Sequence, residues 1–528
     1  MNRKIILFSL IATIFFWSCD IEPELTDSYG DDVPWSSTEN LELYLNTFYP
    51  LIGSNYYSGA VEIDANTDVL KKNTPTDYQN LLAFGSIQIT PSSNPLGNWD
   101  WGYTWIQTCN EFLDGLEKNG DNLPEDIVLR AAGEVRWFRA HVYFELARCY
   151  GGQAILFDKL PEEDYNSLAT AEETWNFIEK DLDFAAEYLP NPDEALKGKL
   201  TKGAAYGLKA RVMLYAQRWK KASDAVTALM SLNYYSLYPN YAELFQLKRT
   251  DNISNLESIV EFGFTSPDFG YSFDYFYCPP GDQGYAQISP TENLISSYQM
   301  ADGSDFSWDN PEHSANPYAN REKRFYASIL YNGANWKERE VETYVDGKDG
   351  YAVGGGTTCT GYYMRKLFDG SIKTQDEGFD PGELTYYYMR YAEILLIYAE
   401  AMAQQDKLTE ALGALNQVRN RAGFETPVTA TNKMEFMELL RHERKIELAF
   451  EGHRFWDLRR WDMAREVLDG LECQGVKITK VDDATFEYEV VDADNGKKRT
   501  YPERYKRFPI PSVELQRNPL MEQFPEWK

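Results

Sequence analysis

Aromatic side chains beside polar ones are the residues of this sequence best suited to chemistry. Phe, Trp and Tyr make up 15% of the 528 residues, and Trp99, Trp101, Tyr103 and Trp105 alternate within the segment NWDWGYTW. An exposed aromatic face suits a sugar, because the CH groups of a pyranose ring stack on it while the hydroxyls take hydrogen bonds from polar neighbours. One aromatic ring that covers on the order of 50 Å² of apolar surface contributes roughly 1 kcal/mol to such binding.

A second aromatic group lies in the middle of the chain, beside Asn, Asp and Gln. Its members are Tyr271, Tyr275, Tyr277, Tyr285, Trp308 and Trp336. Core packing is the alternative use of each of these rings. Two or three that remain exposed would give affinities on the order of millimolar to micromolar for an oligosaccharide.

Catalytic and metal-binding motifs are incomplete. His442 and Glu443 begin an H-E-x-x-H pattern, but Ile446 stands at the second histidine position. The run of glycines at 354–356 lacks the G-K-[ST] of a P-loop, and Val69 stands where an EF-hand loop requires glycine. We therefore expect no catalytic residue, no metal site and no cofactor, and we expect that the protein is not an enzyme.

The N-terminus predicts export and lipid anchoring. A basic pair precedes an apolar run over residues 5–17, which is typical of a secretory signal but too short to span a bilayer. Ser18 and Cys19 close the run as in a bacterial lipoprotein, so we expect residues 1–18 to be removed and Cys19 to be lipidated. The acidic segment at 19–35 is expected to be a solvated tether.

The overall charge opposes two classes of partner. Lys and Arg number 52 against 82 Asp and Glu, which gives a formal net charge of -30. Nucleic acids and anionic membrane surfaces need an electropositive surface, so neither is an expected partner. The five cysteines after Cys19 show no metal-binding spacing, and one or two disulfides among them remain open.

Helical periodicity predicts a mainly α scaffold. It is strongest in four stretches: Arg130–Tyr150, closed by Gly151, Thr174–Leu189, which stops at Pro190, 202–232 and 391–422. Met434–Phe450 would supply another helix. Two of the four stretches read as helical hairpins with the same spacing of small and apolar residues: Ala210, Ala222, Val226 and Leu229 in the first, and Ala399, Ala411, Leu415 and Val418 in the second. This spacing is typical of tetratricopeptide repeats, whose small residues let two helices approach closely.

Two further regions complete the organisation. Residues 231–382 are rich in Gly, Pro, Asn and Tyr, and such a long stretch without periodicity indicates a functional insertion. The charged residues around 441–460 alternate with large apolar ones, so we expect them to be partly buried and to pair with one another rather than to bind a ligand. No linker divides residues 36–528, which predicts a single domain with non-contiguous hairpins at about 130–232 and 391–460.

Several blocks, in order along the chain, resemble the SusD/RagB family of outer-membrane nutrient-binding lipoproteins. They are GEVRWFRAHVYFELARCYGG, KLTKGAAYGLKARVMLYAQRWKKASDAV, MRYAEILLIYAEA with ALGALNQVRNRAGF, ELLRHERKIELAFEGHRFWDLRRW and RFPIPSVELQRNPLMEQFPEW. The resemblance implies a helical SusD-like domain built on tetratricopeptide-like hairpins, with a loop-rich insertion and few strands. It also implies a surface-exposed lipoprotein of the outer membrane whose partner is a SusC-like TonB-dependent transporter.

The resemblance further implies where a ligand binds. In glycan-binding relatives the site lies away from the hairpins, on the N-terminal aromatic segment and the middle loops. Transferred by position, the expected ligand-binding residues are Asp68, Trp99, Trp101, Tyr275, Tyr285, Trp308 and Trp336.

The sequence therefore predicts a surface glycan-binding lipoprotein that captures oligosaccharides and passes them to the transporter. Two alternatives stay open. One is a peptide-binding lid of a peptide-importing transporter, which would need backbone hydrogen bonds more than flat stacking faces. The other is a purely structural tetratricopeptide adaptor.

Overall fold

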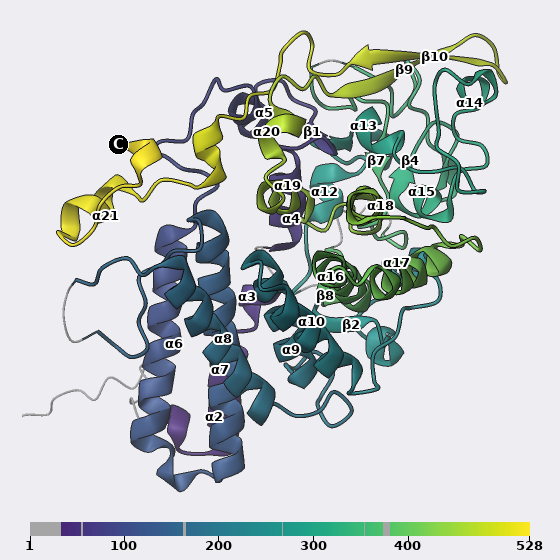
Figure 1. Ribbon diagram of the computed structural model, residues 1–528. Helices are drawn as coiled ribbons and strands as arrows, with labels where there is room; N and C mark the ends of the chain where they lie inside the picture. The colour runs from purple at the N-terminus through teal and green to yellow at the C-terminus, as the bar shows by residue number, and fades with distance from the viewer. Residues whose placement is uncertain (1–32, 54–55, 162–164, 267, 353, 373–380) are drawn as a thin grey trace, which may run out of the picture.

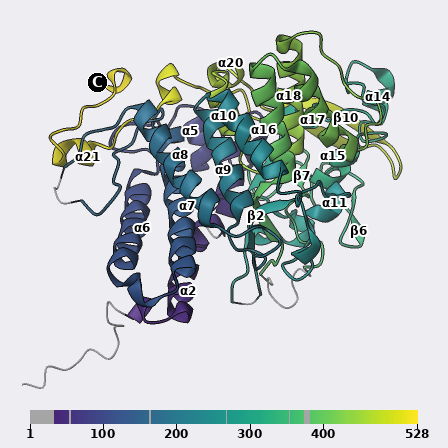
Figure 2. The same ribbon diagram turned by 60° about the horizontal axis from the view of Figure 1, so that its bottom comes forward.

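The computed structural model describes residues 33–53, 56–161, 165–266, 268–352, 354–372 and 381–528. Figures 1 and 2 show a mainly helical molecule, with long helices at one side and a loop-rich part with short helices and strands at the other. The mainly α fold with few strands, expected from the sequence, is confirmed. The signal, Cys19 and most of the acidic tether lie outside the described residues.

The long helices form a continuous series. They are α6 (Trp99–Asn119), α7 (Glu125–Cys149), α8 (Ala171–Tyr188), α9 (Lys202–Tyr215), α10 (Trp219–Met230), α16 (Tyr391–Gln404), α17 (Leu408–Ala422) and α18 (Lys433–Glu447). Each packs on the next, and α10 packs directly on α16. The hairpins α9–α10 and α16–α17 are thus neighbours in space, although some 160 residues separate them in the sequence.

The hairpins pack closely because their facing residues are small. Ala210, Ala222, Ala399 and Ala411 are fully buried, as the repeated spacing predicts. Gly423 ends α17 with a left-handed backbone, φ +105°, which glycine adopts without a Cβ clash. With small residues at the contacts, the apolar faces of the helices pack on one another and form the core of the helical part.

The remaining helices are short. They are α2 (Thr38–Asn46), α3 (Pro50–Gly53), α4 (Tyr56–Asp64), α5 (Tyr78–Ala83), α11 (Tyr241–Leu244), α12 (Phe273–Tyr277), α13 (Glu292–Ile295), α14 (Pro311–Ala315), α15 (Lys323–Ser328), α19 (Arg454–Arg460), α20 (Ala464–Leu468) and α21 (Ser512–Arg517). Single 3-10 turns are η1 (Val33–Trp35), η2 (Gly120–Asn122), η3 (Asn252–Ser254), η4 (Pro280–Asp282), η5 (Glu503–Lys506) and η6 (Pro525–Trp527).

The strands of the described residues form two-stranded antiparallel sheets. They pair as β1 (Leu70–Lys72) with β3 (Ile288–Pro290), β2 (Ser258–Gly263) with β8 (Thr385–Arg390), β4 (Ile329–Leu330) with β7 (Tyr363–Met364), β5 (Asn335–Trp336) with β6 (Arg339–Glu340), and β9 (Gln474–Lys480) with β10 (Phe486–Asp492). Since β8 leads straight into α16, the β2–β8 pair joins the insertion to the second hairpin.

Buried ion pairs fasten the insertion to the hairpins. Glu447 on α18 accepts from Arg324, Arg390 and Arg421, and the Arg390 contact measures 2.6 Å. Burial opposes the charged form of Glu447, but the three guanidinium groups hold its pKa well below the usual range. We call this set, with Glu257, Glu322, Glu443, Glu451, Lys366 and Arg419, the buried charge network.

The charged residues around 441–460 are buried in pairs, as expected, but only some pair with one another. Asp457 accepts from Arg444 and Arg460 at 2.8 Å each. Glu443 and Glu447 instead bind arginines that are distant in the sequence. Spacing along one helix could not reveal these partners.

The described cysteines are buried and form no disulfide: Cys109, Cys149, Cys278, Cys359 and Cys473. Within the described residues, no helix combines the length and apolar character needed to cross a membrane.

Candidate ligand-binding surface

Tyr275 and Tyr285 form an aromatic pair at the surface of the insertion. Their ring centroids lie 4.7 Å apart, and the Tyr275 hydroxyl donates to the Tyr285 hydroxyl over 3.1 Å. Tyr285 is 53% exposed, and the neighbouring Phe276 is 39% exposed. The hydrogen bond to Tyr285 raises the pKa of Tyr275. The rings meet edge to face, with 66° between their planes, and Tyr275 is half-buried, so the pair presents the Tyr285 ring and part of the Tyr275 ring to a ligand.

Helix α12 and the loop after it hold this pair in place. Phe273 and Tyr277, four residues apart on α12, are buried, so the intervening Tyr275 and Phe276 turn outward. The Tyr285 amide donates to the Tyr275 carbonyl over 3.0 Å, which fixes the loop against the helix. This backbone hydrogen bond thus holds the Tyr275–Tyr285 pair, which we call the tyrosine platform, in place.

Trp308 is half-buried and tied to the protein through its indole. Its Nε1 donates to Glu292 over 2.8 Å, and the Tyr362 hydroxyl donates to the other carboxylate oxygen over 2.6 Å. Burial raises the pKa of Glu292. Trp308 can offer a ligand part of its ring, while its polar atom is already used.

Trp336 lies in a separate cavity of about 530 Å³ in the insertion. It is 5% exposed, and its Nε1 has no hydrogen-bond partner among the described residues. Arg365 lies over the indole ring, 5.5 Å from its centroid, and Tyr238 and Gln246 share the lining. The buried N–H could donate to a ligand hydroxyl that enters this cavity.

Trp99 and Trp101 do not act together. Both lie in the first turn of α6, where a separation of two residues places side chains about 200° apart around the axis. Trp99 is 5% exposed and packs on Tyr103 and Tyr150 with centroids 4.9 and 5.0 Å away. Trp101 lines a different cavity, beside Tyr215. The alternation seen in the sequence thus belongs to a helix and does not make one flat platform.

Asp68 is engaged inside the protein. Its two carboxylate oxygens accept from Nε and Nη2 of Arg454, both at 2.8 Å. Burial disfavours the charged form, yet the pKa of Asp68 lies below its usual value because Arg454 stabilises the carboxylate. Asp68 therefore positions α19 through Arg454, and the ligand contact expected from the resemblance stays a prediction.

Residues that sequence reasoning missed include Phe276, Tyr238 and Arg365. They come from three separate segments, and no pattern of spacing links them to Tyr285 or Trp336. Among the described residues, no group of three His, Cys, Asp or Glu side chains is placed to hold a metal ion.

Comparison with known proteins places the chain in a family. The SusD family model matches residues 263–527, and a second model, described as starch-binding associating with outer membrane, matches residues 25–214. The chain belongs to the SusD family.

Relatives and solved structures agree over nearly the whole length of this SusD family member. SusD-like protein P38 of Formosa agariphila is 25% identical over 88% of this chain and 93% of its own. A SusD-like protein of Bacteroides fragilis superposes with a TM-score of 0.78 at 28% identity, covering 93% of this chain and 97% of that one. A SusD-like carbohydrate binding protein of the same species gives 0.77 at 25% identity, with coverage of 92% and 99%.

Proposed function

We propose that this protein is a surface lipoprotein that captures oligosaccharides and passes them to a SusC-like TonB-dependent transporter. The Tyr275–Tyr285 pair at the surface is the observation that carries the proposal, because ring faces beside hydroxyl groups suit the CH faces and hydroxyls of a sugar. Membership in the SusD family and the likeness to a carbohydrate binding protein support the same function.

The location and the partner belong to the same proposal. The second family model is described as associating with outer membrane, which supports a surface position. Cys19 would carry the lipid anchor, as the signal at residues 1–18 indicates. No catalytic step is part of the proposal: capture and release are sufficient.

The expected residues take different roles at the surface and in separate cavities. Tyr275 and Tyr285 supply the main stacking faces, Trp308 offers part of its ring, and Trp336 donates from its cavity. Trp99 and Trp101 contribute through the cavities that they line at α6.

Affinity electrophoresis on a panel of neutral polysaccharides tests the proposal. We expect Tyr285→Ala and Tyr275→Ala each to weaken retention about five- to tenfold, because each removes roughly 1 kcal/mol of stacking. Tyr165→Ala, at an exposed tyrosine that is 43% exposed, is the matched control and should behave as the parent protein.

Unchanged retention of the double Tyr275→Ala, Tyr285→Ala variant would exclude this surface. Peptides, rather than sugars, co-purifying with the transporter complex would favour the peptide-binding alternative.

A further inference from the structure

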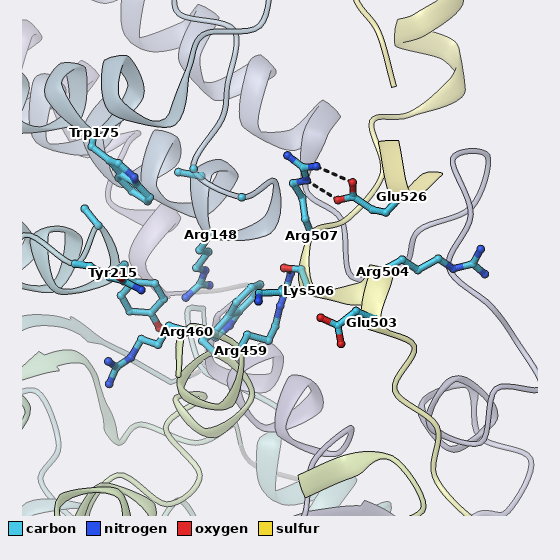
Figure 3. Close-up of a pocket in the computed structure, with 16 residues that line it drawn as sticks. Arg148, Trp175, Tyr215, Arg459, Arg460, Glu503, Arg504, Lys506, Arg507 and Glu526 are labelled. Carbon is cyan, nitrogen blue, oxygen red and sulfur yellow. Dashed lines mark hydrogen bonds and ion pairs between the residues drawn. The ribbon is translucent and has the colours of Figure 1, made fainter. Parts of the chain in front are cut away.

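A pocket of about 820 Å³ lies in the helical scaffold, and none of its lining residues belongs to the insertion at 231–382. The end of α7, the start of α8 and the end of α9 meet α19 and the C-terminal segment there. Figure 3 shows Trp175 and Tyr215 at one side, Arg504 and Arg507 at the other, and Arg148 and Arg459 between them. Tyr275 and Tyr285 do not line this pocket, so it is separate from the tyrosine pair, and it shares Arg148, Tyr215 and Trp456 with the cavity that Trp101 lines.

The pocket is basic in an acidic protein. Six arginine or lysine side chains line it against two glutamates, whereas the chain as a whole carries a net charge of -30. Four of the six cations have carboxylate partners, as in the bidentate pair of Arg507 with Glu526 at 2.7 Å. Within the described residues, Arg459 and Arg504 have none.

Arg459 is the decisive residue. It is 7% exposed, its Nη2 donates to the Lys506 carbonyl over 2.9 Å, and its Nε and Nη1 have no hydrogen-bond partner among the described residues. The rings of Phe508 and Trp456 lie 4.1 and 5.0 Å from its guanidinium carbon and hold it in place. A buried cation with two unmatched N–H groups at a pocket wall is suited to the oxygens of an anion.

Trp175 gives the pocket an aromatic wall. Gly152, with φ +83°, brings the α7–α8 connection against α8, and a Cβ at this position would lie 2.8 Å from Ala171 Cβ and 3.1 Å from the Trp175 indole nitrogen. Trp175 itself is half-buried, which leaves part of its ring to the pocket. A sugar ring could stack there while an acidic substituent reaches Arg459.

We propose that this pocket is a second binding site, which takes an acidic sugar unit through a sulfate ester or carboxylate held by Arg459. The inference rests on the proposed glycan capture and adds an anionic specificity at a separate place. Lys506, exposed at the pocket's rim, adds a second positive charge that can swing toward the ligand. A neutral sugar offers the Arg459 N–H groups only uncharged hydroxyl acceptors and would bind more weakly.

Isothermal calorimetry on the purified full chain tests this site. The probes are glucose 6-sulfate, glucuronate, glucose and inorganic sulfate, so that the ester, the carboxylate, the ring and the anion are separated. We expect at least one acidic sugar to bind about tenfold more tightly than glucose, since charge-assisted hydrogen bonds to a guanidinium are the strong ones. Inorganic sulfate should bind more weakly than that sugar, because it cannot stack on Trp175.

Three variants locate the binding. Arg459→Gln should weaken the acidic sugar about tenfold and Lys506→Gln about threefold, while Trp175→Leu should weaken the sugar and leave inorganic sulfate unchanged. Lys498→Gln, at a lysine that is 67% exposed and does not line the pocket, is the matched control. Thermal melts check folding, and if Arg459→Gln does not fold, Lys506→Gln and Trp175→Leu decide.

The proposal is overturned if glucose binds as tightly as both acidic sugars, or if Lys506→Gln and Trp175→Leu leave the acidic sugar unaffected. Equal binding of sulfate and sugar would reduce the pocket to an anion site and contradict the sugar assignment. The Tyr275→Ala, Tyr285→Ala variant separates the two proposals, since it should lose neutral polysaccharide and keep the acidic sugar.

Discussion

At the scale of single residues, one carboxylate under the tyrosine platform has an unusual environment. Asp274 lies on α12 beside Tyr275 and is buried; its Oδ1 accepts from the Asp369 amide over 3.1 Å, and Lys337 Nζ lies 3.9 Å away. Burial raises the pKa of Asp274 to about 7, and the nearby Asp369 adds to the shift. The group therefore changes charge near neutral pH.

The exchange Asp274→Asn tests this environment. Because the folded pKa lies above the unfolded value of 3.8, the folded protein binds an extra proton between about pH 4 and pH 7. The parent protein should gain stability relative to Asp274→Asn as pH falls from 8 to 4, by on the order of 3 kcal/mol. Urea unfolding at the two pH values measures it. Asp309→Asn, at an exposed carboxylate, is the control, and equal pH dependence of both variants would contradict the prediction.

At the scale of elements, local signals in the sequence decide where helices begin. Helix α8 starts at a capping box: the Thr170 hydroxyl accepts from the Glu173 amide over 3.2 Å, and the Glu173 carboxylate accepts from the Thr170 amide over 2.9 Å. This reciprocal pair satisfies two amides that would otherwise lack partners. It also fixes the first turn of the helix that carries Trp175.

Removing the cap should cost measurable stability. We expect Thr170→Ala to lower the free energy of unfolding by about 1 kcal/mol, because the Glu173 amide loses its acceptor. The same exchange within α6, Thr104→Ala, is the control; alanine favours a helix interior, so its effect should be near zero or slightly stabilising. Chemical denaturation compares the two, and identical losses would argue against the cap.

The arrangement of helices and loops also explains why only part of the site could be predicted from the sequence. The hairpins follow from residues close together in sequence, such as Ala210 and Ala222, whose spacing alone predicts helices in contact. Trp99 and Trp101 seemed equivalent as a pair, but the helical period directs them to different cavities. Only the structure shows which ring of the insertion stays exposed, since that depends on neighbours far along the chain.

At the scale of the whole molecule, the buried charge network joins segments that are remote in sequence. Glu447 binds Arg324 and Arg390, which belong to α15 and to the end of β8. A buried ion pair is worth little against an apolar replacement, but loss of one partner leaves the others uncompensated. The network therefore makes the insertion and the hairpins dependent on each other.

The exchange Glu447→Gln should destabilise the protein strongly. It leaves three buried arginines with one carboxylate fewer, and we expect a loss of roughly 3–5 kcal/mol in the free energy of unfolding. Glu438→Gln, at an exposed position of the same helix, should change stability by less than about 0.5 kcal/mol. Guanidinium unfolding is the measurement, and similar midpoints for both variants would show that the network does not hold the two parts together.

The sequence by itself determined the helical scaffold and the repeated hairpins, because helix periodicity, caps and small-residue spacing act over a few residues. The resemblance of its ordered blocks indicated the family. The tertiary structure decided which side chains can meet a ligand. Asp68 forms an ion pair with Arg454, 386 residues away, and Tyr285 lies at the surface beside Tyr275. Arg459 lines a pocket and has two N–H groups without a hydrogen-bond partner among the described residues. Pairing and exposure depend on contacts between distant segments, and no local pattern encodes them.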